Sequence, residues 1–169
     1  IDRISGLGET MAIDTLAKLL SQPYDCLILV HPYIQILENL STEIQGLGLL
    51  HLNISKELST FLMTISASER SRFSQKWLLD TLITFQNGPV LCTCPDLLFD
   101  PSLKIDPLSL IRQAARIKQL IVLWPGEYSA NTLSYAVPEH HHFRTWKVTD
   151  SFLRQPVVLI RQISTSQGA

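Results

Sequence analysis

Residues 31–38 follow an apolar run at 26–30, where a parallel sheet would present a ligand at the carboxyl end of a strand. Phosphate binding there uses the pattern G-x-x-x-x-G-K-[ST], because backbone N–H groups must surround the phosphates and a Lys must reach their charge. The segment contains no Gly, Lys, Ser or Thr, Pro32 lacks an N–H donor, and Glu38 would repel phosphate. We therefore expect no nucleotide cofactor at this degenerate loop, which consists of His31, Pro32, Tyr33, Ile34, Gln35, Ile36, Leu37 and Glu38.

The apolar run at 90–94 ends at a second position that could serve nucleotide chemistry. An acidic residue at the end of such a strand holds Mg²⁺. Thr93 and Cys94 occupy this position, and neither supplies the charge that a hard cation prefers. Asp96 follows a few residues too late, and the isolated His31 is best interpreted as a structural histidine. The sequence therefore predicts a protein that is not an enzyme.

Asp100, Lys104 and Asp106 form a polar group within apolar surroundings. Both aspartates precede a proline, which is typical of turn starts, and Asp106 followed by Pro107 is typical of a helix N-cap. The alternative hypothesis is that Asp100 and Lys104 belong to a loop that binds a partner protein.

Basic residues cluster on two expected helices. Arg112 and Arg116 stand four residues apart and so share one helix face, while Arg70, Arg72 and Lys76 gather at the start of another helix. Such residues usually form a solvated surface. The first pair could instead bind a partner protein, and the second cluster could bind nucleic acid weakly, because a net charge of −1 gives no global basic field.

Other chemistry is not supported by the residue pattern. Adjacent histidines point in different directions, so we expect an exposed loop and no metal site at His140, His141 and His142. The cysteines form neither a disulfide framework nor a zinc pattern, and we expect reduced, buried thiols in a cytoplasmic protein at Cys26, Cys92 and Cys94. No apolar run reaches the roughly 18 residues of a membrane span, and no signal peptide is recognised.

Short apolar runs alternate with helical patterns, which predicts βαβ units around a mostly parallel sheet. With 46% hydrophobic and 17% charged residues, the 169 residues suit one domain with its core at 24–163. About five strands are expected, at 26–30, 49–53, 90–94, 120–124 and, as an edge strand, 157–160. Helices are expected at 10–21 and 34–45, from a cap at Ser55, from Ser68 to 87, and at 108–118 behind Asp106, whereas 126–152 is the least regular stretch but too structured in composition for a tail.

The run LFDPSLKIDPL at 98–108 resembles the segment after the Walker B strand in the BrxF family, the small P-loop component of bacteriophage-exclusion (BREX) systems. Three further stretches fit in the same order: 53–59 with 68–70, then 120–126, then 133–140. Together they cover roughly residues 25–146.

The resemblance implies a three-layer P-loop NTPase-like α/β domain whose Walker A loop falls on 31–38 and whose Walker B acid falls on Thr93. Because neither element keeps its catalytic residues, the implied protein is a pseudo-NTPase: a non-catalytic assembly or regulatory component of a prokaryotic antiphage defence complex. Its partners would be other subunits of that complex or further copies of the chain. Two alternatives are open: a nucleotide-binding switch with a divergent pocket near 31–36, and a nucleic-acid-binding accessory subunit that uses Arg70, Arg72, Arg112 and Arg116.

Overall fold

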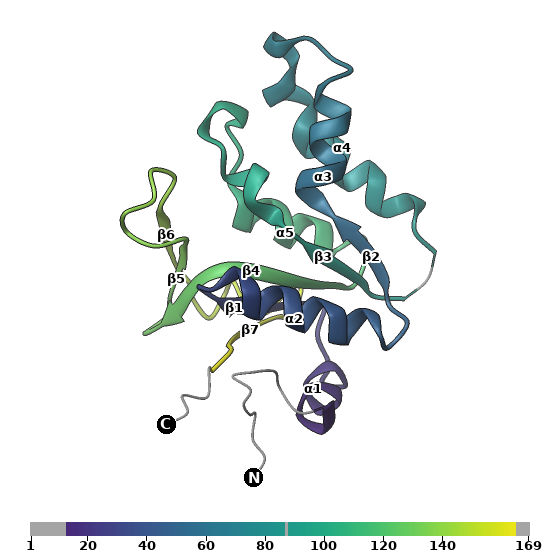
Figure 1. Ribbon diagram of the computed structural model, residues 1–169, viewed down its shortest axis with the longest axis vertical. Coiled ribbons are helices and arrows are strands. Elements are labelled where there is room, and N and C mark those ends of the chain that lie inside the picture. The colour runs from purple at the N-terminus through teal and green to yellow at the C-terminus, as the bar shows by residue number, and fades with distance from the viewer. Residues whose placement is uncertain (1–12, 87, 165–169) are drawn as a thin grey trace.

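The computed structural model describes residues 13–86 and 88–164, with side chains from Leu16 onward. This part of the chain forms seven strands and five α-helices (Figure 1). Their order is α1 (Ile13–Leu20), β1 (Cys26–His31), α2 (Ile34–Gln45), β2 (Leu50–Asn53), α3 (Ile54–Leu62), α4 (Arg70–Thr84), β3 (Val90–Thr93), α5 (Pro107–Ala115), β4 (Leu120–Ser129), β5 (Thr132–Tyr135), β6 (Arg144–Lys147) and β7 (Val158–Gln162). Short 3₁₀ turns cover Ala67–Glu69, Pro95–Phe99 and Pro101–Leu103.

Five parallel strands form the centre of the molecule in the spatial order β2-β3-β4-β1-β7. Helices α1 and α2 cover one face of this sheet, and α3, α4 and α5 cover the other (Figure 1). The predicted α/β class with a mostly parallel sheet is therefore confirmed, as is the edge position of the last strand.

Strand β1 shows why the sequence reads as an unbroken apolar run. All six of its residues are buried, because helices lie on both faces of the sheet. Successive side chains point to opposite faces. Ile28 and Val30 accordingly belong to the core under α3–α5, whereas Leu27 and Leu29 pack with Leu37 of α2.

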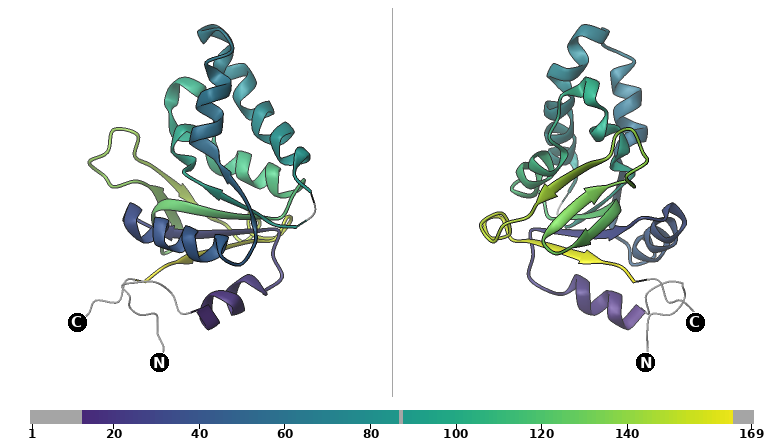
Figure 2. Two further views of the ribbon diagram at one scale, coloured as in Figure 1. Left: turned by 45° about the vertical axis from the view of Figure 1, so that its right-hand side comes forward. Right: turned by 90° about the vertical axis from the view of Figure 1, so that its left-hand side faces the viewer.

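Strand β4 extends past the parallel sheet and continues into an antiparallel hairpin with β5 and β6 (Figure 2). Gly126 lies at the junction, where an added Cβ atom would come within 1.9 Å of the Ser134 carbonyl oxygen. The indole Nε1 of Trp124 donates to this same oxygen at 2.8 Å. This hairpin corrects the expected number of about five strands, because β5 and β6 lie within 126–152, where no strand was predicted.

Helix starts were predicted with mixed success. Asp106 is the N-cap of α5 with Pro107 at the first helical position, as expected, and its carboxylate accepts from the Ser109 N–H at 3.3 Å. The expected cap at Ser55 is wrong, because Asn53 caps α3. The helix expected from Ser68 begins at Arg70, after a 3₁₀ turn. Of the helix predicted at 10–21, residues 10–12 lie outside the described residues.

Across the described residues, every helix is too short or too polar to cross a bilayer.

Candidate functional site

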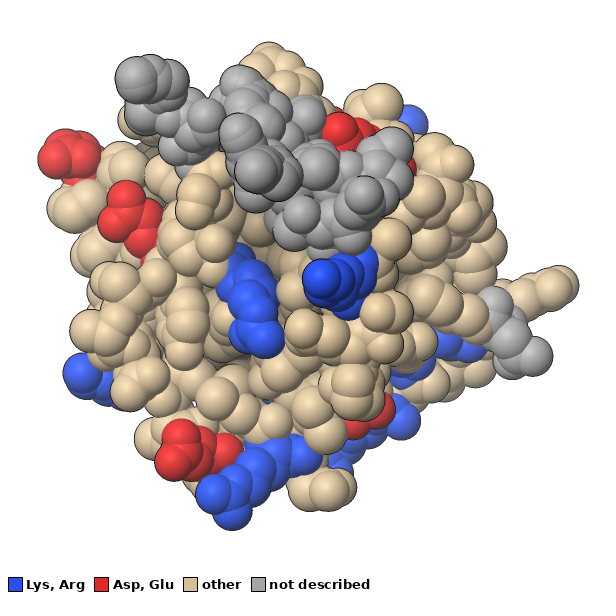
Figure 3. All heavy atoms as spheres, turned by 90° about the horizontal axis from the view of Figure 1, so that it is seen from below, with Lys and Arg blue, Asp and Glu red and all other residues tan. Residues whose placement is uncertain are grey.

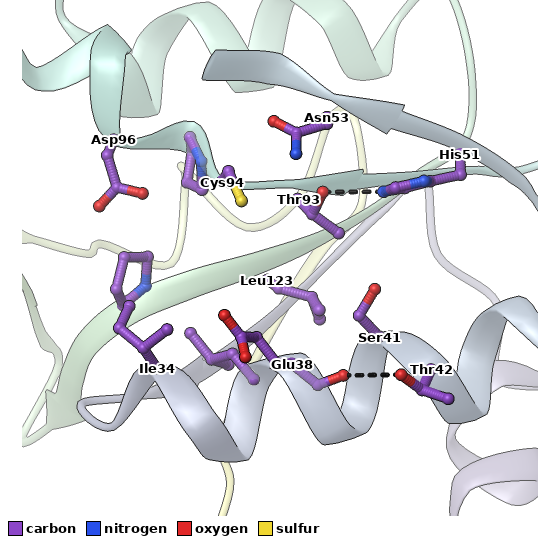
Figure 4. A pocket seen from close by; sticks show the side chains of 13 residues that line it. Ile34, Glu38, Ser41, Thr42, His51, Asn53, Thr93, Cys94, Asp96 and Leu123 are labelled. Atoms are coloured by element: carbon purple, nitrogen blue, oxygen red, sulfur yellow. Dashed lines mark hydrogen bonds between the residues drawn. The ribbon is translucent and has the colours of Figure 1, made fainter. Parts of the chain in front are cut away.

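A cavity of about 310 Å³ lies where the carboxyl ends of β2, β3 and β4 face helix α2. Figure 4 shows its side chains, which come from the first turns of α2 and from the ends of these strands. This edge is where open α/β sheets bind ligands. The cavity contains two predicted positions, the degenerate loop through Ile34, Leu37 and Glu38, and the strand end at Thr93 and Cys94.

The connection between β1 and α2 consists of only Pro32 and Tyr33. The Tyr33 N–H donates to Nδ1 of His31 at 2.9 Å, so this amide is already used within the turn. His31 is 2% exposed, and burial lowers the pKa of its imidazole although Glu127 opposes the shift. The turn therefore offers no ring of amides for a phosphate and holds a neutral, enclosed histidine.

Tyr33 and Ile34 point outward at this turn, where they are 64% and 51% exposed. Helix α2 begins without a side-chain cap, since Tyr33 occupies its N-cap position. Two large apolar side chains therefore lie on the surface beside the cavity.

Two polar pairs lie at the ends of β2 and β3. The Thr93 hydroxyl lies 2.8 Å from Nε2 of His51 on the neighbouring strand β2, and burial lowers the pKa of His51. The Asn53 carboxamide oxygen caps α3 by accepting from the Lys56 N–H at 3.0 Å. These contacts give the strand ends a fixed, uncharged polar surface.

Cys94 was expected to be a buried strand residue, and this is wrong. The strand ends at Thr93, and Cys94 adopts a left-handed backbone conformation with φ of 51° and an exposed side chain. Partial desolvation raises the pKa of its thiol, as do the negative charges of Asp96 and Glu38, while hydrogen bonds from Thr93 and Asn53 act in the opposite direction. The thiol is therefore accessible but stays protonated near neutral pH.

From the sequence, Asp96 follows the strand a few residues too late to hold Mg²⁺. In the structure it lines the cavity and is held in place. Its carboxylate accepts from the Tyr135 hydroxyl at 2.9 Å. The Tyr135 ring in turn stacks on Phe99 with a centroid distance of 3.7 Å, and Trp124 meets Phe99 edge-on at 5.0 Å. Sequence alone could not find this role, because Tyr135 lies 39 residues away in the hairpin that was not predicted.

The cavity carries a negative charge. The carboxylates of Glu38 and Asp96 project into it from opposite walls (Figure 4), and none of its 13 lining residues is Lys or Arg. Within the described residues, no hydrogen bond is formed to the Glu38 carboxylate. Such an arrangement repels phosphate and attracts cations.

A wider groove of about 760 Å³ adjoins the cavity at Asn53, Cys94 and Asp96. Asp100 and the histidines at 140–142 lie along it. The three histidine rings contact one another, and the His142 N–H donates to Nδ1 of His140 at 3.0 Å. No cluster of His, Cys, Asp or Glu suited to a metal ion occurs in the part of the chain that the structure describes.

The predicted partner residues do not gather at the cavity. Asp100 caps the 3₁₀ turn Pro101–Leu103, and the Ser102 N–H that it accepts at 2.9 Å lowers its pKa. Lys104 is exposed with a left-handed φ of 54°. Arg112 lies on α5 and Arg116 is the C-cap of this helix, and both donate to the Gln155 carbonyl oxygen, at 2.9 and 3.2 Å.

The second basic cluster also makes contacts within the chain. Arg70 donates from Nε to the Leu62 carbonyl at 3.1 Å, Arg72 lies over the Phe73 ring, and Lys76 pairs with Asp80 four residues on. Figure 3 shows a different face, the one seen from below in Figure 1, and there basic side chains are scattered among acidic and uncharged ones.

No family model matches the chain, and neither a curated protein nor a solved structure shows significant similarity to it.

Proposed function

We propose that this protein is a P-loop NTPase-like domain without nucleotide chemistry, acting as a non-catalytic assembly or regulatory component of a prokaryotic antiphage defence complex. One observation carries the non-catalytic part: the short turn between β1 and α2, in which the Tyr33 amide is bound to His31 and large side chains replace the phosphate loop. The link to phage defence is drawn from the resemblance of residues 98–108 and the stretches around them.

The place of the two degenerate positions supports the P-loop part of the proposal. Strand β1 precedes the degenerate loop and strand β3 ends at the degenerate Walker B position, with β4 between them. Both positions line the cavity at the carboxyl edge of the parallel sheet, where open α/β sheets bind ligands. The β1–turn–α2 unit also keeps the strand–loop–helix succession of a P-loop while lacking its sequence.

The exposed residues beside the turn favour a role in protein contacts. Tyr33 and Ile34 place exposed apolar area at the carboxyl edge of the sheet. Aromatic residues are enriched at the centres of protein interfaces, and exposed apolar patches often mark such sites. The cavity next to them is acidic, so a nucleotide is not expected to bind there.

Calorimetric titration with ATP, ADP and GTP in the presence of Mg²⁺ tests the loss of nucleotide binding. We expect no saturable heat at high micromolar protein. Saturable binding of any of the three would overturn the pseudo-NTPase assignment and favour a nucleotide-binding switch.

A matched pair of double variants tests the protein contact. Tyr33→Ser with Ile34→Ser removes the apolar area at the turn, whereas Met63→Ser with Ile83→Ser removes comparable exposed area elsewhere, at residues that are 81% and 61% exposed. Binding to candidate defence subunits, measured by co-purification, should be lost with the first pair and kept with the second. Equal binding by both double variants would exclude the turn as the interface.

A further inference from the structure

We propose that the cavity at the carboxyl edge of the sheet binds a small organic cation, consisting of an ammonium or guanidinium group on a short apolar chain. This inference is independent of the proposed function, because it concerns a ligand and not a partner subunit. It stands on the size, wall chemistry and charge of the cavity.

The size suits a small molecule. About 310 Å³ is near the lower end of the range of about 300–1,000 Å³ that is typical of ligand pockets. Ile34, Leu37 and Leu123 provide apolar wall, and Leu37 and Leu123 are at least nine-tenths buried. A short hydrocarbon chain would displace water from these side chains.

The charge selects a cation. Glu38 and Asp96 face the same space from α2 and from the turn after β3 (Figure 4), and no basic side chain among the lining residues neutralises them. Asp96 is held in place by the Tyr135 hydroxyl at 2.9 Å. The Glu38 carboxylate accepts no hydrogen bond within the described residues and can therefore receive an N–H donor from a ligand.

The other titratable groups of the cavity leave this charge unchanged. Burial lowers the pKa of His51, so its ring adds no positive charge near neutral pH. The pKa of the Cys94 thiol is raised, mainly by desolvation and then by the two carboxylates, so the thiol adds no negative charge. The Thr93 hydroxyl is engaged with His51, and Asn53 contributes a neutral amide. The two carboxylates thus determine the ligand's charge.

Cys94 provides a reporter for binding. The other two cysteines are 0% and 1% exposed, so a maleimide should modify Cys94 alone in the folded protein. The probes are n-butylammonium and n-butylguanidinium, with n-butanol and butyrate as neutral and anionic controls of similar shape. We expect the cations to slow Cys94 modification in a saturable manner, and we expect no protection by the alcohol or the carboxylate.

Two variants separate the site from general effects of charge. Glu38→Gln should weaken protection by the cations about tenfold or more. Glu57→Gln, at an exposed position on α3 outside the cavity, should leave protection unchanged. Because Glu38→Gln also alters the intrinsic reactivity of the thiol, fractional protection by the probe is compared, and not the absolute rate.

Several results would overturn the proposal. These are absence of protection by both cations at millimolar concentration, equal protection by butyrate, and undiminished protection in Glu38→Gln. The titration with ATP, ADP and GTP tests the proposed loss of nucleotide binding independently of these results.

Discussion

The Arg112 guanidinium donates from Nη2 to the backbone carbonyl of Gln155 at 2.9 Å, connecting α5 to a segment 43 residues away. The guanidinium carbon of Arg112 also lies 5.0 Å from the centroid of the Phe152 ring. Arg116, one turn later, reaches the same carbonyl. Arg112 and Arg116, whose spacing suggested a binding surface, therefore bind the segment before β7.

Replacing Arg112 with Ala should destabilise the protein. Loss of the charged hydrogen bond and of the contact with Phe152 is expected to lower the free energy of unfolding by about 2 kcal/mol. Urea denaturation measures this value. Arg72→Ala, at an exposed position whose contact is with the adjacent Phe73, should change it by less than about 0.5 kcal/mol. Equal effects of the two substitutions would contradict the structural role of Arg112.

A methyl group at Gly126 should disturb the junction of β4 and β5. The new Cβ would lie 1.9 Å from the Ser134 carbonyl oxygen, and a backbone atom cannot move aside without separating the strands. We expect Gly126→Ala to cost about 2 kcal/mol or more and to alter the fluorescence of Trp124, whose indole binds the same oxygen. Gly46→Ala is the control, because its Cβ would meet its nearest neighbour at 3.3 Å. Native-like stability of Gly126→Ala would show that the hairpin is more loosely paired than described.

The cap at Asp106 can be tested with two substitutions. Its carboxylate accepts from the Ser109 N–H at 3.3 Å and from the Trp146 indole at 3.1 Å. Asp106→Ala removes both bonds and should lower the free energy of unfolding by about 1–2 kcal/mol, whereas Asp106→Asn keeps an acceptor oxygen and should cost much less. Thermal and urea unfolding of the two variants make the comparison, and an equal loss in both would mean that the charge matters more than the cap.

Acidification should weaken the protein through His31. Because burial sets its folded pKa below the ordinary value of 6.5, the unfolded chain binds a proton that the folded chain does not. Stability should therefore decrease as pH falls through 6.5 toward the folded pKa, and His51 contributes in the same direction. NMR titration should give a pKa for His31 below 6.5.

The variant His31→Asn supplies the control for this pH dependence. Its amide oxygen can still accept the Tyr33 N–H, so the turn should persist while one titrating group is removed. We expect a flatter dependence of unfolding free energy on pH. An unchanged slope would show that other groups cause the acid effect.

The reactivity of Cys94 should report the charge of the cavity without any ligand. Desolvation raises the pKa of its thiol first, and the carboxylates of Asp96 and Glu38 raise it further. Glu38→Gln should therefore lower this pKa and speed alkylation near neutral pH, because the thiolate is the reacting form. Iodoacetamide kinetics across pH measure both quantities. A slower reaction in Glu38→Gln would contradict the placement of its carboxylate near the thiol.

The parallel sheet could be predicted because its strands are buried on both faces. The runs at β1 and at the first half of β4 are apolar without interruption, and such runs have few other interpretations. The cap at Asp106 was equally visible, since its pattern is local. The hairpin was not predicted because β5 and β6 have only four residues each. More buried residues alternate with more exposed ones along both strands, so neither strand forms a continuous apolar run.

The candidate site could be predicted in position but not in composition. The degenerate loop and the end of β3 were recognised because ligands bind at this edge in many α/β proteins. The roles of Asp96 and His51 depend on Tyr135 and Thr93, which are 39 and 42 residues away. No local pattern encodes such pairs. Likewise, Arg112 and Arg116 looked like a surface pair because their shared acceptor lies far along the chain.

Strand β4 changes partners along its length, which gives its two halves different mechanical strength. From Leu120 to Pro125 it lies alongside β1, and pulling it lengthwise would load those hydrogen bonds together in shear. From Gly126 onward it pairs with β5, and a force applied at the hairpin tip would open these bonds one after another, like a zipper. Under tension the hairpin should therefore peel away at low force, while the central sheet should resist until a much higher force breaks it.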